Sequence, residues 1–253
     1  NSNEIELLDN MEDCLYDNEL YDCGLIRKNK VFFPPKNTSM LMVYDTDSHK
    51  VEYRELYSEE IKKQIDFKPS YFGHLVYKDG EDNLYFFNRE YPIVTILKEN
   101  HIVQIQSLEV ADKIVLQKIY CENDGILYFP TSNTNMIITY DIKLSKFNQI
   151  VISNKIQGFS SCIYDNGYLI LMSTDAKHII KYKIDSAEET YFRMDIGEID
   201  VDDLWQIKKQ KDKYLIIPLL DVKKEDRMKC LYVLDRNFNI TEIKDIDEHY
   251  SVM

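Results

Sequence analysis

Hydrophobic and polar positions alternate in short blocks along this chain, and the most regular block is Gly125–Ile152. Its first apolar run, Ile126–Phe129, leads into a polar turn at Thr131–Asn135. Alternating positions follow, then a second turn at Asp141–Ser145 and a last alternating run, Phe147–Ile152. Short runs with a period of two, separated by turn residues, are typical of β-strands. The block therefore predicts three antiparallel strands joined by two tight turns.

The same pattern recurs in weaker form and carries two marks in register. The first mark is an apolar strand that ends at a turn, and its last apolar residues lie 54, 42, 43 and 45 residues apart: Phe33, Phe87, Phe129, Met172 and Ile217. The second mark is an aromatic residue or Leu followed by Asp or Lys at the end of the next strand: Tyr44-Asp45, Leu97-Lys98, Tyr140-Asp141, Tyr182-Lys183 and Leu234-Asp235. A period of about 42–45 residues with four strands per unit is typical of a β-propeller blade.

Two further strands complete each unit. The opening strands are predicted at Gly24–Arg27, Tyr71–Val76, Leu116–Tyr120, Phe159–Ile163 and Leu204–Ile207. The closing strands are predicted at Val51–Leu56, Ile102–Leu108, Phe147–Ile152, Thr190–Met194 and Ile240–Ile246. We therefore predict an all-β fold, a β-propeller of about five four-stranded antiparallel blades over residues 23–246. Residues 1–22 form an N-terminal extension that can supply a closing strand or part of a sixth blade, and residues 247–253 form a C-terminal tail. The alternative is a β-sandwich whose hairpins look alike by chance.

About residues 23–246 repeat one order of features: an apolar strand, a polar turn, the Tyr-Asp mark and then a strand that opens with Lys and a hydrophobic residue. It resembles the degenerate blades of kelch-like and quinoprotein-like β-propellers. The paired glycines of kelch strands and the Gly-His and Trp-Asp pairs of WD40 blades are absent from the sequence. The resemblance therefore implies a fold and no particular function.

Two insertions lengthen the repeat. Tyr57–Ser70 separates the first two units, and Ser58 there is predicted to cap a short helix. Leu220–Lys229 is a charged insertion between the second and third strands of the fifth unit. Because strands run up and down in alternation, a link between units emerges on the same face as the loop between strands two and three. Both insertions and the turn Thr131–Asn135 are predicted on that face, where binding usually occurs, and Asp141–Ser145 on the opposite one.

Composition narrows the classes of partner. The 253 residues carry 31 Lys and Arg against 44 Asp and Glu, a net charge of -13. An acidic chain repels phosphate backbones and anionic lipid, so nucleic acid and membranes are not expected partners. No apolar run approaches the roughly 20 residues of a membrane span. The chain begins at Asn1, so a leader or a longer part can have been removed. We expect a monomer or a part of a larger chain.

The cysteines bear on metal, cofactor and compartment. They are five in number, scattered and without a Cys-x-x-Cys pair: Cys14, Cys23, Cys121, Cys162 and Cys230. Neither a zinc site nor a disulfide framework is predicted, and no metal and no cofactor are expected. Reduced cysteines favour a cytoplasmic protein. The alternative is a secreted protein, in which Cys14 and Cys23 can form a disulfide bond.

Catalytic motifs for nucleophilic, metal or nucleotide chemistry are absent from the sequence. Four polar residues on the opening strands are predicted to line the central channel of a propeller: His74, Gln117, Ser161 and Gln206. A polar ring around water is the structural interpretation. A small-ligand or metal site on the axis is the functional one.

The insertion face also collects residue types that anchor protein interfaces. The predicted partner-binding residues are Arg89, Tyr91, His178, Trp205 and Tyr71. For Trp205 and Phe159, the alternative is that they cap the core between blades. The first functional hypothesis is therefore a non-catalytic propeller that presents this face to a protein or peptide.

The second hypothesis is a carbohydrate-active propeller, either a glycoside hydrolase or a sugar binder. Its mechanism needs two carboxyl groups about 5–10 Å apart. Asp22 and Asp203, with Asp202 beside the latter, precede the opening strands of the first and last units. These units are neighbours if the ring closes, so the two carboxylates are the candidate acid pair.

Overall fold

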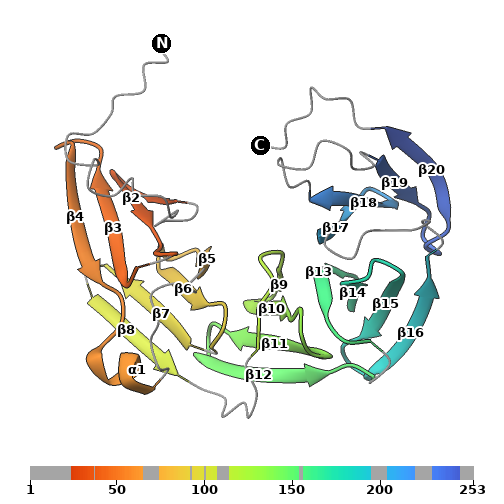
Figure 1. Ribbon diagram of the computed structural model, residues 1–253, viewed down its shortest axis with the longest axis horizontal. Helices are drawn as coiled ribbons and strands as arrows, with labels where there is room; N and C mark the ends of the chain where they lie inside the picture. Colours follow the sequence, from red (N-terminus) through yellow and green to blue (C-terminus); the bar gives the residue numbers. More distant parts are fainter. Residues whose placement is uncertain are drawn as a thin grey trace. The chain divides into compact units, whose positions relative to one another are not determined.

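The structure is a computed structural model that describes residues 24–36, 38–64, 74–91, 93–99, 101–106, 114–153, 156–194, 204–219 and 230–245 (Figure 1). The chain divides into two compact parts, each of which contains several of the sequence repeats. The first unit, in this structural sense, is Asn1–Lys113 and the second unit is Ile114–Met253. Among the described residues, the only helix is α1, Glu59–Gln64, and all other regular elements are strands.

The first unit contains two four-stranded antiparallel sheets whose strands pair in sequence order. The first sheet consists of β1 (Leu25–Arg27), β2 (Lys30–Phe33), β3 (Met40–Asp45) and β4 (Lys50–Glu55). The second consists of β5 (His74–Lys78), β6 (Leu84–Asn88), β7 (Ile93–Lys98) and β8 (His101–Gln106). Helix α1 lies in the link between them, where Ser58 Oγ accepts a hydrogen bond from the Ile61 amide at 3.3 Å. The predicted capped helix is confirmed.

The second unit contains three sheets of the same kind. The third sheet of the chain consists of β9 (Cys121–Asn123), β10 (Ile126–Pro130), β11 (Met136–Asp141) and β12 (Lys146–Val151). The fourth consists of β13 (Phe159–Asp165), β14 (Tyr168–Ser173), β15 (His178–Lys183) and β16 (Glu188–Arg193). The fifth consists of β17 (Leu204–Gln210), β18 (Lys213–Leu219), β19 (Cys230–Leu234) and β20 (Ile240–Asp245).

The five four-stranded sheets in the described residues confirm the predicted repeat, and the β-sandwich alternative does not hold. One predicted strand, 116–120, is wrong, because β9 begins only at Cys121. Leu116 makes a single bridge to Thr131, and the regular ladder resumes where Cys121 pairs with Tyr128. Four residues, 117–120, thus lie opposite two, 129–130, and the extra residues bulge out of the ladder.

Burial explains why the middle strands read as continuous apolar runs. All five residues of β6 are buried, whereas most residues of β4 and β12 are exposed. The middle strands pack on both faces, and the fourth strands are edges with one face to solvent. In the first unit, one apolar cluster joins both sheets and includes Phe32, Leu41 and Phe86.

The Tyr-Asp mark has a physical basis. Its apolar member is buried in four of the five pairs, as Tyr140 is, with its ring 4.8 Å from that of Phe147, whereas Tyr44 is partly exposed. Its Asp accepts hydrogen bonds from the backbone of the next turn. Asp45 Oδ1 accepts from the Ser48 amide at 2.9 Å, and Asp141 Oδ1 accepts from the Leu144 amide at 2.9 Å. The pair therefore anchors the strand in the core and starts the following turn.

Several hairpins place a residue other than Gly in the left-handed region. Lys28, Asp124, Asn166 and Lys211 have φ values of 55°, 51°, 50° and 56°. Two-residue hairpins with this geometry match the twist of the strands that they join. They bring charged and amide side chains to the tips of the sheets.

Candidate functional site

Each unit has two rims, formed by the two ends of its strands. The insertion rim carries the loops after each second strand and the links between sheets, which among the described residues are 34–36, 38–39, 56–64 and 88–91 in the first unit, and 131–135, 152–153, 156–158 and 174–177 in the second. The turn rim carries the other hairpins. In the first unit the Leu56 amide donates to Ser39 O at 3.0 Å, and in the second the Phe159 amide donates to Thr131 O at 2.7 Å. The prediction that links and these loops share a face is confirmed for the described residues, and residues 220–229 lie outside them.

A buried polar network occupies the insertion rim of the first unit. Nδ1 of His74 lies 2.7 Å from the carbonyl oxygen of Pro35, and Nε2 is hydrogen-bonded to the hydroxyl of Tyr57. The same hydroxyl accepts a hydrogen bond from Nδ2 of Asn88 at 3.0 Å. The network therefore joins the loop after β2, the link after β4 and the ends of β5 and β6.

The donors in this network follow from chemistry. The carbonyl of Pro35 can only accept, so Nδ1 of His74 carries a proton and Nε2 accepts from Tyr57. His74 is 2% and Tyr57 1% exposed. Burial raises the pKa of Tyr57, which keeps its hydroxyl protonated. With every partner satisfied and the rings covered, the network holds two sheets together and offers no reactive group to a substrate.

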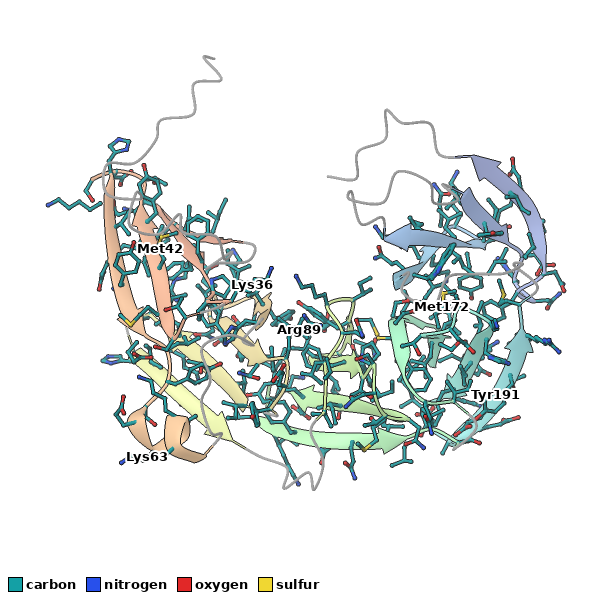
Figure 2. All side chains as sticks on the ribbon, in the orientation of Figure 1. Lys36, Met42, Lys63, Arg89, Met172 and Tyr191 are labelled. Carbon is teal, nitrogen blue, oxygen red and sulfur yellow. The ribbon has the colours of Figure 1, made fainter. Side chains whose placement is uncertain are left out.

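The turn after β6 is held in one shape by Asn88, which is fully buried. Its Oδ1 accepts hydrogen bonds from the amides of Glu90 at 2.9 Å and Tyr91 at 3.0 Å. Tyr91 packs against the core of the first unit, and Arg89, which is labelled in Figure 2, is partly exposed. The turn thus presents the predicted residues Arg89 and Tyr91 from a rigid base.

The second unit repeats this arrangement with hydroxyl side chains. Ser173, at the end of β14, accepts a hydrogen bond from the His178 amide at 3.0 Å, and Asp175 Oδ1 accepts from the Lys177 amide at 3.0 Å. Thr131 donates to Met136 O at 2.8 Å in the equivalent turn. His178 is partly exposed, with its Nδ1 3.7 Å from Asp175 Oδ1. A buried polar residue after the second strand therefore fixes the turn in both units.

The other predicted interface residues are not found on the exposed surface that the structure describes. Trp205 is not exposed: it is 3% accessible and packs in a core cluster, 5.8 Å from the ring of Tyr232. Phe159 is also fully buried. The burial of both residues agrees with the alternative drawn from the sequence, that they cap the core between blades. Tyr71 lies outside the described residues.

The predicted channel residues are packed in their own units. Ser161 is fully buried, and its hydroxyl accepts a hydrogen bond from the Ile207 amide at 3.0 Å, which joins β13 to β17. Gln117 is buried and Gln206 is partly exposed. A ring that includes both His74 and these residues would span the two units and stays a prediction.

The acid pair Asp22 and Asp203, together with Asp202, lies outside the described residues, so the carbohydrate-active hypothesis also stays a prediction. Within the residues that the structure describes, no three His, Cys, Asp or Glu side chains gather as a metal site. In the same residues, no helix is long and apolar enough to cross a membrane.

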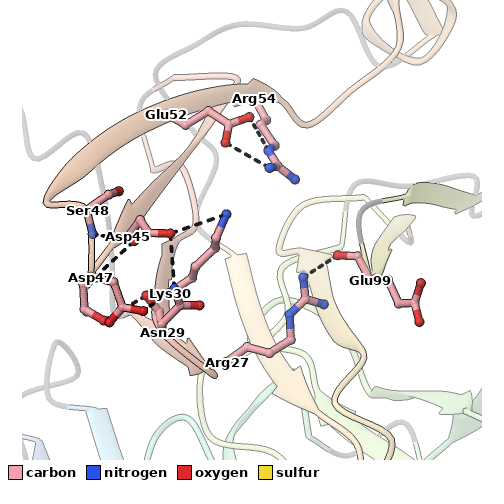
Figure 3. Close-up of polar contacts among 10 residues, drawn as sticks. Arg27, Asn29, Lys30, Asp45, Asp47, Ser48, Glu52, Arg54 and Glu99 are labelled. Atoms are coloured by element: carbon pink, nitrogen blue, oxygen red, sulfur yellow. Dashed lines mark hydrogen bonds and ion pairs between the residues drawn. The ribbon is translucent and has the colours of Figure 1, made fainter.

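Sequence reasoning missed the pockets, which lie on the turn rims. In the first unit, a pocket of about 400 Å³ is lined by Arg27, Lys30 and Glu99 among others. Arg27 lies 4.8 Å above the ring of Phe32 and donates to Leu97 O at 3.0 Å and to the Glu99 carbonyl (Figure 3). Burial lowers the pKa of Arg27. Its guanidinium therefore joins the two sheets rather than facing a ligand.

Comparisons with known proteins bear on the fold. No protein-family model matches the sequence, and no curated protein is significantly similar to it. A solved structure of catalytically inactive virginiamycin B lyase from Staphylococcus aureus with quinupristin matches 93% of this chain and 73% of its own, with 13% identity and a TM-score of 0.62. The nidogen/laminin complex matches 86% and 76%, with 7% identity and a TM-score of 0.52. The mitotic checkpoint complex matches 90% and 69%, with 10% identity and a TM-score of 0.54.

These likenesses settle the fold class. The fold is a β-propeller fold. At 7 to 13% identity they carry no function to this chain. The narrower resemblance to kelch-like and quinoprotein-like blades stays a prediction.

Proposed function

We propose that this chain is a non-catalytic β-propeller scaffold that binds a protein or peptide partner through the insertion rims of its units. The observation that carries the proposal is the way in which Asn88 and Ser173 hold their turns. Both are buried and bond to the turn backbone, so the turns need little further ordering when a partner binds. Binding surfaces that are ordered in advance lose less entropy on association.

The side chains on these turns suit a protein interface. On the first unit, Arg89 and Tyr91 belong to the residue types that dominate hot spots, and the insertion rim of the second unit separately carries the polar His178. Trp205 is buried and is left out of the proposed surface. Two of the similar structures are complexes, one of nidogen with laminin and one of the mitotic checkpoint, which is compatible with a protein partner for this fold.

The test starts from a partner captured with the full chain and then purified. Arg89→Glu is compared with Lys98→Glu, which reverses a charge on the turn rim of the same unit. We expect Arg89→Glu to weaken binding at least about 10-fold, equivalent to about 1.4 kcal/mol, and Lys98→Glu to leave it unchanged. Circular dichroism and thermal unfolding confirm that both variants fold. Weaker binding by Lys98→Glu together with normal binding by Arg89→Glu would exclude the insertion rim.

A further inference from the structure

Basic side chains gather at one place on this acidic protein. A pocket of about 310 Å³ opens on the turn rim of the second unit, between the hairpin tips β13–β14 and β17–β18. Four cations line it: Lys181, Lys209, Lys211 and Arg236. They face two carboxylates, those of Asp165 and Asp212, so the lining has a net charge of +2, whereas the whole chain has -13. The sign of the local charge is therefore opposite to that of the protein.

Asp165 organises one side of the pocket. Its Oδ2 accepts a hydrogen bond from the Tyr214 hydroxyl at 2.5 Å, and its Oδ1 forms an ion pair with Lys209 Nζ. The carboxylate is 11% exposed. With Lys209 beside it, the charge of Asp165 is already neutralised, so it does not cancel the other cations. This contact spans two sheets, which fixes the width of the pocket.

Within the part of the chain that the structure describes, the remaining cations are available to a ligand. No hydrogen bond or ion pair joins the side chains of Lys211 or Arg236 to another described residue, and both residues are exposed. Lys181 Nζ lies 4.2 Å from the centre of the Tyr168 ring, an interaction that leaves its N–H groups free to donate to an anion. Guanidinium and ammonium groups form strong charge-assisted hydrogen bonds to carboxylate and phosphate oxygens. The carboxylate of Asp212, at the exposed hairpin tip, is the one acid that opposes them.

We propose that this pocket binds a small organic oxyanion with at least two negative charges, such as a phosphate monoester or a di- or tricarboxylate. A singly charged anion would satisfy only one of the three available cations. The pocket is at the lower end of the size that ligand sites have, about 300 Å³ upwards, which suits a small molecule. It lies on the turn rim of the second unit, at the opposite strand ends from the insertion rim of the same unit.

The test titrates the full chain with inorganic phosphate and with citrate at constant ionic strength, with chloride as the reference anion, and follows backbone amide shifts. We expect saturable shifts at Asn166 and Lys211 with a dissociation constant below about 1 mM for at least one probe. Saturation by phosphate alone assigns a phosphate ligand, and saturation by citrate alone assigns a carboxylate ligand.

The decisive comparison uses the double variant Lys211→Ala/Arg236→Ala. It is matched by Lys28→Ala/Lys98→Ala, which removes two cations from the turn rim of the first unit. We expect the first variant to weaken binding at least about 10-fold and the second to change it less than about two-fold. Equal weakening by both variants, or no saturable shift with either probe up to about 10 mM, overturns the proposal.

Discussion

Nδ1 of His74 lies 2.7 Å from the carbonyl oxygen of Pro35, so a residue on β5 is hydrogen-bonded to the loop that follows β2. The two residues are 39 positions apart and belong to neighbouring sheets. Tyr57, from the link between these sheets, closes the network on the other side of the ring. The insertion rim of the first unit is therefore held by side-chain hydrogen bonds as well as by apolar packing.

Tyr57→Phe tests this network. The change removes one hydroxyl and leaves Nε2 of His74 and Nδ2 of Asn88 without this partner in a buried site. We expect the free energy of unfolding in urea to fall by about 1–3 kcal/mol. The control is Tyr53→Phe, at a side chain on β4 that is 42% exposed, with an expected change within about 0.5 kcal/mol. Equal effects of the two substitutions would mean that the network contributes nothing to stability.

Gly158→Ala tests the close approach of two loops on the insertion rim of the second unit. Gly158 has φ +100°, and a Cβ there would lie 2.0 Å from the carbonyl oxygen of Ser132. We expect a loss of more than about 2 kcal/mol in unfolding free energy. Gly125→Ala separates the two causes, because Gly125 has φ +79° but open space around it, and should lose only about 1 kcal/mol. A similar loss in both variants would leave no role for the contact with Ser132.

Asp165→Asn tests the electrostatic role of the pocket. Burial by itself would raise the pKa of Asp165, but the hydrogen bonds from Lys209 and Tyr214 outweigh it and hold the pKa below its ordinary value. A lowered pKa in the folded state means that the stabilisation is present above the unfolded pKa of about 4. It is lost as the pH falls through the folded pKa.

We therefore expect Asp165→Asn to destabilise the protein near neutral pH, and the difference from the wild type to shrink as the pH falls below about 4. Urea unfolding at a series of pH values measures this difference. Asp185→Asn, in an exposed turn of the same rim, removes an equal charge and should change the free energy of unfolding by less than about 0.5 kcal/mol. A difference for Asp165→Asn that stays constant down to about pH 3 would contradict the prediction.

Cys121 and Cys162 offer a further test, because their sulfur atoms lie 3.4 Å apart between β9 and β13. Burial raises the pKa of Cys162, so the partly exposed Cys121 should react first with oxidised glutathione. Cys162 then attacks the mixed disulfide. One oxidised glutathione is consumed, one protein disulfide forms and two molecules of reduced glutathione are released.

The measurement counts free thiols by alkylation and mass spectrometry in a variant with Cys14, Cys23 and Cys230 changed to Ser. We expect two thiols before treatment and none after it, with no added glutathione on the product. In Cys121→Ser on the same background, the remaining buried thiol should stay reduced. Two free thiols after prolonged treatment would contradict the prediction.

The order of elements was predictable because it depends on local interactions. Alternation and turn residues identified strand after strand, as in Gly125–Ile152, and the Ser58 cap identified α1. The Tyr-Asp mark also acts locally, since Asp45 bonds to the Ser48 amide only three positions further on. The exception, 116–120, depends on a bulge beside the bridge from Leu116 to Thr131, two residues that are not adjacent in the sequence.

The candidate sites were not predictable to the same extent. The sequence by itself determined the number of strands, their pairing into sheets and which loops share a rim, because period-two burial and alternating strand direction follow from the chain alone. Only the tertiary structure decided that Trp205 is buried and that Tyr57 completes the His74 network. It also decided that Lys209 and Tyr214, which lie 44 and 49 positions further along the chain, both contact Asp165. Such contacts arise where one sheet packs on the next, and side chains there are selected by shape and charge at the junction rather than by any pattern along the chain.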